Sequence, residues 1–251
     1  MNVVAIIQAR MGSTRLPGKV LSDIGGEPML ARVVRRVRRA ALVGQTVVAA
    51  TSAEADEPIV QECERLGVEL YRGSELDVLD RFYRAAMRFG ADAVVRITSD
   101  CPLIDPGVID CVIGAFLDWQ PDYASNVLRR TYPRGLDTEV ASREALERAW
   151  REAAEPYQRV HVTPYFYQHP ERFRLLSVTS GHEAGRGGSQ TRPHYRWTVD
   201  TAEDLALVRE IYRRLGGGDT FCWTDVLDLL ERDPGLADLN RRIQQKALHE
   251  G

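Results

Sequence analysis

Short apolar runs alternate along this chain with longer segments in which apolar residues recur every three or four positions. The short runs have the length of buried strands, and the longer segments have the period of amphipathic helices. We expect strands over Val3–Ile7, Thr46–Thr51, Val68–Tyr71, Ala93–Thr98, Asp122–Val127, Glu139–Ala141, Phe173–Val178 and Tyr195–Val199. We expect helices over residues 28–37, 57–66, 78–89, 106–119, 143–154 and 156–169, with further helices after Asp200.

Residues at the helix ends support these boundaries. Pro28 and Pro106 suit a first helical turn, and Gly90 suits the end of a helix. Ser142 is a favourable N-cap, and the run Thr201-Ala202-Glu203-Asp204 has the form of a capping box.

The alternation of strands and helices predicts an α/β fold, with a Rossmann-like, mostly parallel sheet covered by helices on both faces. We expect one domain over residues 1–251. From about residue 129 to residue 194 the alternation becomes irregular, and we expect a small middle excursion there for substrate binding or dimerisation. Residues 180–194 contain four glycines and few apolar residues, so we expect a loop or insertion there.

Composition narrows the classes of function. With 44% hydrophobic and 27% charged residues and a net charge of −3, the chain offers no general attraction for nucleic acid. The first apolar run is too short for a signal peptide or a membrane span, so we expect a cytoplasmic protein without a membrane partner. The four cysteines form no C-x-x-C pair and the histidines no H-x-x-x-H pair, which argues against disulfides and zinc.

The first strand opens into a loop, residues 8–19, that combines glycines with three cations. Gly12 and Gly18 allow close approach to an anion, and Arg10, Arg15 and Lys19 supply positive charge. Lysine occurs elsewhere only at position 246, whereas arginine fills the other basic positions. A compact, rotatable ammonium group suits a phosphate-bridging role, although chance placement is the alternative.

Two common phosphate motifs are excluded by spacing. Five residues separate Gly12 from Gly18, where the Walker pattern needs four, and Val20 stands where that pattern needs a hydroxyl. No G-x-G-x-x-G opens a strand-to-helix turn, so a dinucleotide-binding fingerprint is also missing.

Two aspartates follow predicted strands, Asp100 after residues 93–98 and Asp200 after residues 195–199. Ligands of open α/β sheets bind beyond the carboxyl ends of the strands, so both carboxylates are expected near the basic loop. Carboxylates facing a phosphate loop need a cation between them, and we infer Mg²⁺ held by Asp100 and Asp200 together with substrate phosphates. The alternative is an ordinary turn or helix-start aspartate at each position.

The sequence also resembles a known family. Its motifs look like those of the spore-coat polysaccharide branch of the cytidylyltransferases, which is related to the CMP-sugar-acid synthetases. The matching segments are residues 8–19, Arg72-Gly73-Ser74-Glu75 with Asp77-Val78-Leu79-Asp80-Arg81, residues 96–105, residues 132–137, residues 161–165 and residues 196–201.

The resemblance implies a fold of the nucleotide-diphospho-sugar transferase type, a homodimer, and transfer of CMP from CTP to a sugar for surface polysaccharide biosynthesis, with release of pyrophosphate. It implies catalytic roles for Arg15, Lys19, Asp100 and Asp200, with the metal on the two aspartates. The nucleotide-binding residues that it implies are Gln8, Ala9, Arg10, Met11, Gly12, Ser13, Arg72 and Ser99.

The acceptor is expected to be an acidic sugar, because residues 129–139 combine three arginines with acidic side chains. The candidate acceptor-binding residues are Arg134, Asp137, Glu139, Arg159 and His161. Relatives often carry Glu before that histidine, whereas this chain has Val160. A solvated charged loop is the alternative for residues 129–139.

Two other functions stay open at this stage. A nucleotide-sugar-dependent glycosyltransferase shares the broad architecture, but such enzymes commonly hold metal with D-x-D, and no such pair occurs in this sequence. A non-catalytic nucleotide-binding protein would not need the two metal carboxylates.

Overall fold

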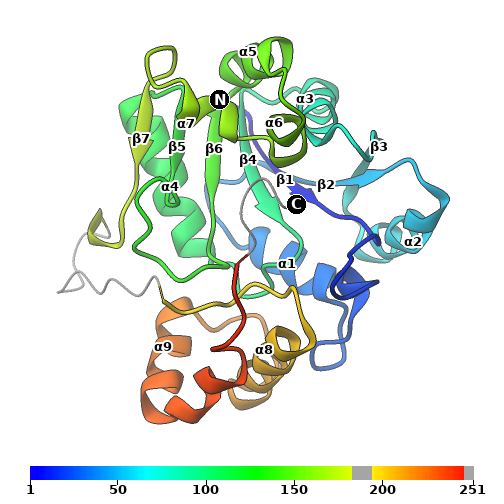
Figure 1. The fold of residues 1–251 in the computed structure, drawn as a ribbon, viewed down its shortest axis with the longest axis vertical. Helices are drawn as coiled ribbons and strands as arrows, with labels where there is room; N and C mark the ends of the chain where they lie inside the picture. Colours follow the sequence, from blue (N-terminus) through cyan, green and yellow to red (C-terminus); the bar gives the residue numbers. More distant parts are fainter. Residues whose placement is uncertain (183–193, 246–251) are drawn as a thin grey trace.

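Seven strands form one sheet in the order β3-β2-β1-β4-β6-β5-β7 (Figure 1) in this computed structural model, which describes residues 1–182 and 194–245. The strands are β1 Val3–Gln8, β2 Gln45–Thr51, β3 Glu69–Gly73, β4 Ala93–Thr98, β5 Tyr123–Ser125, β6 Glu139–Ser142 and β7 Leu175–Ser177. All neighbouring pairs are parallel except those made by β6, which runs antiparallel to β4 and β5.

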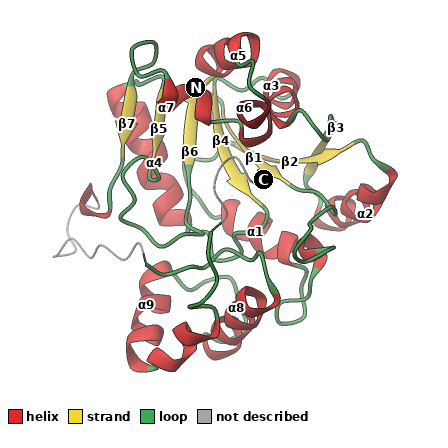
Figure 2. Ribbon diagram, viewed as in Figure 1, coloured by secondary structure: helices red, strands yellow, loops and turns green. Residues whose placement is uncertain are grey.

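Helices cover both faces of this sheet (Figure 2). The α-helices are α1 Met29–Val37, α2 Glu57–Leu66, α3 Val78–Arg88, α4 Pro106–Trp119, α5 Arg143–Glu152, α6 Pro156–His161, α7 Pro164–Gln168, α8 Ala202–Arg214 and α9 Trp223–Arg232. Short 3-10 helices lie at η1 Lys19–Leu21, η2 Glu54–Asp56, η3 Ser180–His182 and η4 Pro234–Leu239.

The alternation of side chains along β1 divides the core in two. Val3, Ala5 and Ile7 pack with α1, α2 and α4, whereas Val4 and Ile6 pack with α3, α5 and the α6–α7 segment. This is the consequence of the two-residue period of a strand that is buried on both faces.

A third layer lies beyond the carboxyl ends of the central strands. There α8, α9 and η4 pack around the fully buried Trp197, together with Met29 and Leu103 from the sheet side (Figure 1). The Tyr212 hydroxyl of α8 donates to the Pro102 carbonyl at 2.8 Å, which fixes this layer to the turn after β4. The space between the sheet and the third layer is therefore bounded by strand ends on one side and by α8 on the other.

Most of the predicted elements are confirmed. The predicted bounds of α2, α4 and β4 coincide with those in the structure, and the Ser142 hydroxyl caps α5 by accepting from Ala145 N. The capping box at the start of α8 is present, with Thr201 and Asp204 satisfying each other's backbone amides. Strands β5 and β7 are shorter than predicted.

The prediction of a strand over Tyr195–Val199 is wrong. The segment is extended and buried, but its only ladder contact within the described residues is an isolated bridge between Arg196 and Arg134. It crosses the strand ends instead of joining the sheet. The backbone of this segment packs directly against Gly135. A Cβ on Gly135, where φ is +107°, would lie 2.6 Å from the carbonyl carbon of Trp197.

The prediction of one helix over residues 156–169 is also wrong. Val162 adopts φ 72°, in the left-handed region, and Pro164 begins a new helix, so the segment forms α6 and α7 instead. The middle segment is also less separate than expected, because β6 and β7 belong to the main sheet. The predicted loop at residues 180–194 falls largely on residues 183–193, which lie outside the described residues.

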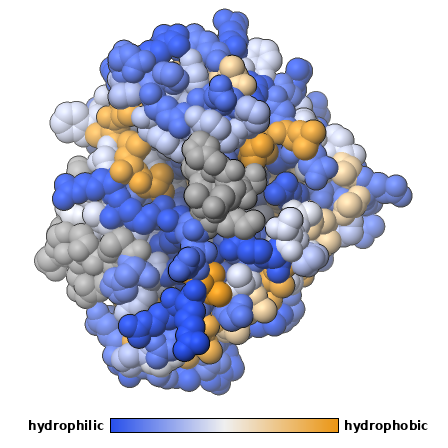
Figure 3. Space-filling model, in the orientation of Figure 1, coloured by the Kyte–Doolittle hydropathy of each residue, from blue (hydrophilic) through white to orange (hydrophobic). Residues whose placement is uncertain are grey.

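The surface in view is mainly hydrophilic, with apolar side chains in small separate patches (Figure 3). The predicted homodimer stays a prediction. Within residues 1–182 and 194–245, no helix is both long enough and apolar enough to cross a membrane. All four cysteines are free thiols.

Candidate active site

The basic loop leaves β1 at Gln8 and ends where Lys19 opens η1. Gly18 adopts φ 69° and donates its amide to the Met11 carbonyl at 3.1 Å, which closes the loop on itself. The amides of residues 12–15 donate no hydrogen bond to any other described residue. A run of unpaired main-chain N–H groups beside cations is a suitable cradle for phosphate oxygens.

A buried aspartate that sequence analysis missed holds the start of this loop. Asp56, 2% exposed, accepts from Met11 N at 2.7 Å and from both the amide and the hydroxyl of Thr51 at the end of β2. On the other side, the Gln8 carbonyl accepts from the amide of Ser99, which follows β4. The loop is thus fixed to the ends of both strands that flank β1.

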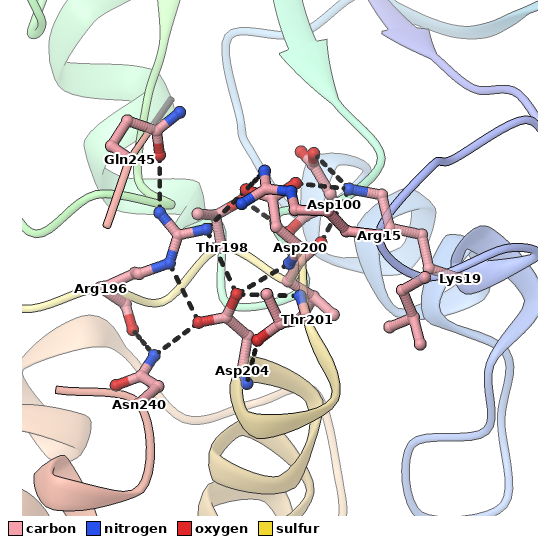
Figure 4. A network of polar contacts seen from close by, with 12 residues as sticks. Arg15, Lys19, Asp100, Arg196, Thr198, Asp200, Thr201, Asp204, Asn240 and Gln245 are labelled. Atoms are coloured by element: carbon pink, nitrogen blue, oxygen red, sulfur yellow. Dashed lines mark hydrogen bonds and ion pairs between the residues drawn. The ribbon is translucent and has the colours of Figure 1, made fainter. Parts of the chain in front are cut away.

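Three oxygens from distant parts of the chain surround the Lys19 ammonium group (Figure 4). Lys19 Nζ lies 3.0 Å from Asp100 Oδ2, 2.8 Å from Asp200 Oδ1 and 2.8 Å from the Val199 carbonyl. The structure therefore brings together the loop after β1, the turn after β4 and the residue before α8, as expected from the position of the strand ends.

The charges at this point perturb one another. Burial lowers the pKa of Lys19, but the two carboxylates outweigh burial and leave that pKa above its usual value. Burial raises the pKa of Asp200, but Lys19, Arg196 and Arg15 outweigh it and leave that pKa below its usual value. Both groups are therefore charged at neutral pH.

More cationic side chains contact Asp200 than contact Asp100. Arg15 Nη2 lies 3.0 Å and Arg196 Nη2 2.5 Å from Asp200 Oδ2, while Lys19 is on Oδ1. Arg196 was not among the predicted site residues. The signal that could have found it is the spacing of four residues between Arg196 and Asp200, repeated between Asp200 and Asp204.

The other predicted nucleotide residues line or support the loop. Ala9 donates its amide to the Ala49 carbonyl, Ser13 Oγ accepts from Leu16 N at 3.4 Å, and the Arg10 side chain is exposed. Gly12 is also exposed, and a Cβ there would lie 3.8 Å from Glu75.

The Arg72 guanidinium is engaged by residues that follow β2 at the edge of the sheet. Its guanidinium donates to the carbonyls of Thr51 and Ala53 and pairs with Glu57 at 3.0 Å. It therefore holds the segment after β2, and a role near the base stays a prediction.

The predicted acceptor segment lies beside the extended segment that leads to Asp200, because the Arg134 amide donates to the Tyr195 carbonyl and the Trp197 amide donates to the Arg134 carbonyl. Asp137 accepts two hydrogen bonds from Arg130, at 2.6 and 2.9 Å. The Arg134 guanidinium makes no hydrogen bond or ion pair with another described residue. Burial lowers the pKa of Arg134, and the positive charge of Arg130 lowers it further. A half-buried guanidinium that pairs with no other described residue favours an anionic ligand.

Two other acceptor candidates are engaged inside the protein. Glu139 is 5% exposed, and its two oxygens accept from Arg96 and from the Tyr123 hydroxyl. Arg159 forms a two-pronged pair with Asp77, the N-cap of α3. The geometry favours structural roles for these two residues, and their acceptor roles stay predictions.

His161 is the last residue of α6 and is half-buried. Its role toward an acceptor stays a prediction. Val160 precedes it in the same helix.

Fold and site together define a class. A mostly parallel sheet, a basic loop after its first strand and two carboxylates facing that loop are the parts that a nucleotidyltransferase needs. The chain belongs to the cytidylyltransferase family, which matches residues 4–228. It is therefore a nucleotidyltransferase, and the family resemblance is confirmed.

Several known proteins are similar to it. The spore coat polysaccharide biosynthesis protein SpsF of Bacillus subtilis is 34% identical over 241 residues, covering 94% of this chain and 97% of that protein. The 3-deoxy-manno-octulosonate cytidylyltransferase of Geobacter sulfurreducens is 43% identical over 112 residues, 44% of this chain and 43% of that enzyme.

Solved structures agree on the fold. A cytidylyltransferase from Leptospira borgpetersenii superimposes with a TM-score of 0.88 at 29% identity, covering 98% of this chain and 100% of that chain. The structure of CMP:2-keto-3-deoxy-manno-octonic acid synthetase complexed with CTP gives a TM-score of 0.64 at 21% identity, covering 86% of this chain and 100% of that chain. The predicted nucleotide-diphospho-sugar transferase fold is confirmed.

The buried Arg96–Glu139 pair generates a first prediction. Replacing Glu139 by Ala leaves the Arg96 guanidinium buried without its partner and should lower the free energy of unfolding by about 3 kcal/mol or more, measured by urea denaturation. The double variant Arg96→Met with Glu139→Leu should regain most of that loss. A stable Glu139→Ala variant whose only change is a raised KM for the acceptor would instead place Glu139 in the substrate site.

Proposed function

We propose that this protein is a magnesium-dependent cytidylyltransferase that transfers CMP from CTP to an acidic sugar, with release of pyrophosphate, for surface polysaccharide biosynthesis. The observation that carries the proposal is the contact of Lys19 Nζ, at the end of the basic loop, with carboxylate oxygens of both Asp100 and Asp200 at 3.0 Å or less. Family membership supports CTP as the donor. The name of the Bacillus subtilis relative supports the pathway, and that of the Geobacter sulfurreducens relative supports a sugar acid.

The oxygens at the site suit a hard divalent cation. Asp100 Oδ2, Asp200 Oδ1 and the Val199 carbonyl converge on one point, which the Lys19 ammonium group occupies. The described residues contain no cluster of three or more His, Cys, Asp or Glu side chains that could hold a metal. Mg²⁺ is commonly bound by one or two carboxylates with substrate phosphates, so Asp100 and Asp200 fit it better than a metal that needs a full protein cage.

The chain's own residues account for the remaining requirements of nucleotidyl transfer. The acceptor hydroxyl gives its proton to water as its oxygen forms a bond to the α-phosphorus, while the bond from that phosphorus to the bridging oxygen breaks and pyrophosphate leaves. Amides of residues 12–15 hold phosphate oxygens, and Lys19 and Arg15 neutralise charge on the leaving group. Mg²⁺, when bound, adds Lewis-acid neutralisation of phosphate charge.

Positioning of the acceptor completes the proposed reaction. Arg134 pairs with the carboxylate of the sugar acid, and the fixed Arg130–Asp137 pair offers hydrogen-bonding groups to its hydroxyls. Holding the acceptor next to Asp100 converts a bimolecular encounter into an oriented attack.

The activity itself is the second prediction. The purified protein, given each nucleoside triphosphate with MgCl₂ and a panel of sugar acids, should release pyrophosphate only with CTP and should form a CMP-sugar, identified by mass spectrometry. Release of a nucleoside diphosphate from a nucleotide sugar would indicate a glycosyltransferase. Thermal stabilisation by CTP without turnover with any sugar would indicate a binding protein.

The metal carboxylates give the third prediction. Asp100→Ala and Asp200→Ala should each reduce kcat about a hundredfold or more, since loss of a metal ligand removes roughly 3 kcal/mol of transition-state stabilisation. Asp238→Ala is a matched control, because that carboxylate is a surface partner of Arg241. Near-normal magnesium-dependent turnover in either site variant would remove that residue from the metal site.

Lys19 gives the fourth prediction. In the absence of CTP its ammonium group competes with a divalent ion for Asp100 and Asp200, so Lys19→Met should bind Mn²⁺ alone at least about tenfold more tightly than the wild type, measured by EPR of free Mn²⁺. The same variant should lose about a hundredfold in turnover, because the phosphates lose a cation. Lys19→Arg keeps the charge and should not tighten Mn²⁺ binding. Equal Mn²⁺ affinity in Lys19→Met and wild type would show that the lysine does not share the metal's position.

A further inference from the structure

A second carboxylate lies behind Asp200, and it is fully buried. Asp204, 0% exposed, accepts five hydrogen bonds from four residues. Its donors are the amides of Asp200 and Thr201, the Arg196 guanidinium at two nitrogens, and the Asn240 side-chain amide. Such saturation is far beyond what a helix cap needs, because a capping box requires only one reciprocal pair.

Arg196 links this buried carboxylate to the site (Figure 4). Its Nε and Nη2 donate to Asp204 at 3.0 and 3.2 Å, and Nη2 also donates to Asp200 Oδ2 at 2.5 Å. Two-pronged contact with a carboxylate fixes the plane of a guanidinium group. Arg196 is therefore held by Asp204 in the orientation that reaches Asp200.

The two oxygens of Asp200 thus have different environments. Oδ1 contacts Lys19, a side chain of the basic loop, whereas Oδ2 contacts Arg15, also of that loop, and Arg196. Triphosphate would compete for Lys19 and Arg15, but Arg196 stays on Asp204. Oδ1 is then the oxygen released for a metal, while Oδ2 keeps the carboxylate in place.

Asn240 holds the far side of this arrangement. Its side-chain amide donates one hydrogen bond to the Arg196 carbonyl at 2.9 Å and another to Asp204 Oδ1 at 2.8 Å, and the residue is 5% exposed. It thereby ties the backbone of Arg196 to the carboxylate that orients the Arg196 side chain. Asn240 lies beyond residues 4–228, the part of the chain that matches the family.

We propose that Asn240, acting through Arg196 and Asp204, is a positioning residue for the metal-binding carboxylate of Asp200. The inference rests on the proposed function, since it assumes that Asp200 holds the divalent ion. Groups that orient metal ligands commonly change metal affinity about 10- to 100-fold when they are removed. Asn240, the residue that follows η4, thus contributes to the metal site through Arg196 and Asp204.

The fifth prediction tests this with the full chain. Asn240→Leu keeps a similar volume but removes both donors, so Mn²⁺ binding in the presence of CTP and without acceptor should weaken about tenfold, measured by EPR of free Mn²⁺. The Mg²⁺ concentration for half-maximal turnover should rise by the same factor. Arg241→Ala is the matched control, because that side chain is 80% exposed and pairs only with Asp238 among the described residues.

Stability is separated from positioning by measuring each variant well below its own melting temperature. Asn240→Ala removes the same donors without steric risk and should show the same loss of Mn²⁺ affinity. Wild-type Mn²⁺ affinity in both Asn240 variants, whatever their melting temperatures, would overturn the inference while leaving the proposed function intact. Failure of the wild type itself to bind Mn²⁺ with CTP would overturn the proposed function and the inference with it.

Discussion

The structure depends on one electrostatic constraint, the partial burial of two carboxylates around a single ammonium group. Asp100, Asp200 and Lys19 come from three separate connections, and their charges would oppose burial if any one were missing. Their mutual attraction leaves the pKa of Lys19 raised and that of Asp200 lowered, despite the opposing effect of burial on each. The rest of the site is arranged around this point, with the loop on one side and α8 on the other.

The supporting contacts divide the site into a fixed part and an exchangeable part. Asp56 fixes the beginning of the loop, and Asp204 fixes Arg196, both through buried carboxylates that accept several hydrogen bonds. Among the described residues, Lys19 and Arg15 are held only by Asp100, Asp200 and the Val199 carbonyl, which are groups that a metal can also engage. A site that must receive a polyanion needs both parts, because rigid donors position phosphates and movable cations neutralise them.

Sequence reasoning predicted the sheet, its helices and the convergence of Lys19, Asp100 and Asp200, because hydrophobic period and the strand-end rule are local and general. It failed at Tyr195–Val199, an extended, largely buried segment that makes only one isolated bridge, Arg196 with Arg134, within the described part of the chain. It failed again at Val162, whose positive φ ends α6 without a glycine to signal the break. Asp56 and Asn240 were missed because they act on residues far apart in the chain, Met11 for Asp56 and Arg196 and Asp204 for Asn240, and no local pattern displays such contacts. Arg196 was missed although its four-residue spacing from Asp200 is a local signal.

The position of Lys19 has a consequence for the cohesion of the molecule. Its contacts with Asp200 and Val199 join the loop after β1 to the segment that leads into α8, and thus join the sheet to the third layer. A nucleotide that draws Lys19 onto its phosphates removes that direct link and replaces it with one that runs through the ligand. The link between this loop and α8 would then run through the substrate during turnover, and departure of pyrophosphate would restore the direct contact, while the Tyr212–Pro102 hydrogen bond keeps the two layers joined throughout.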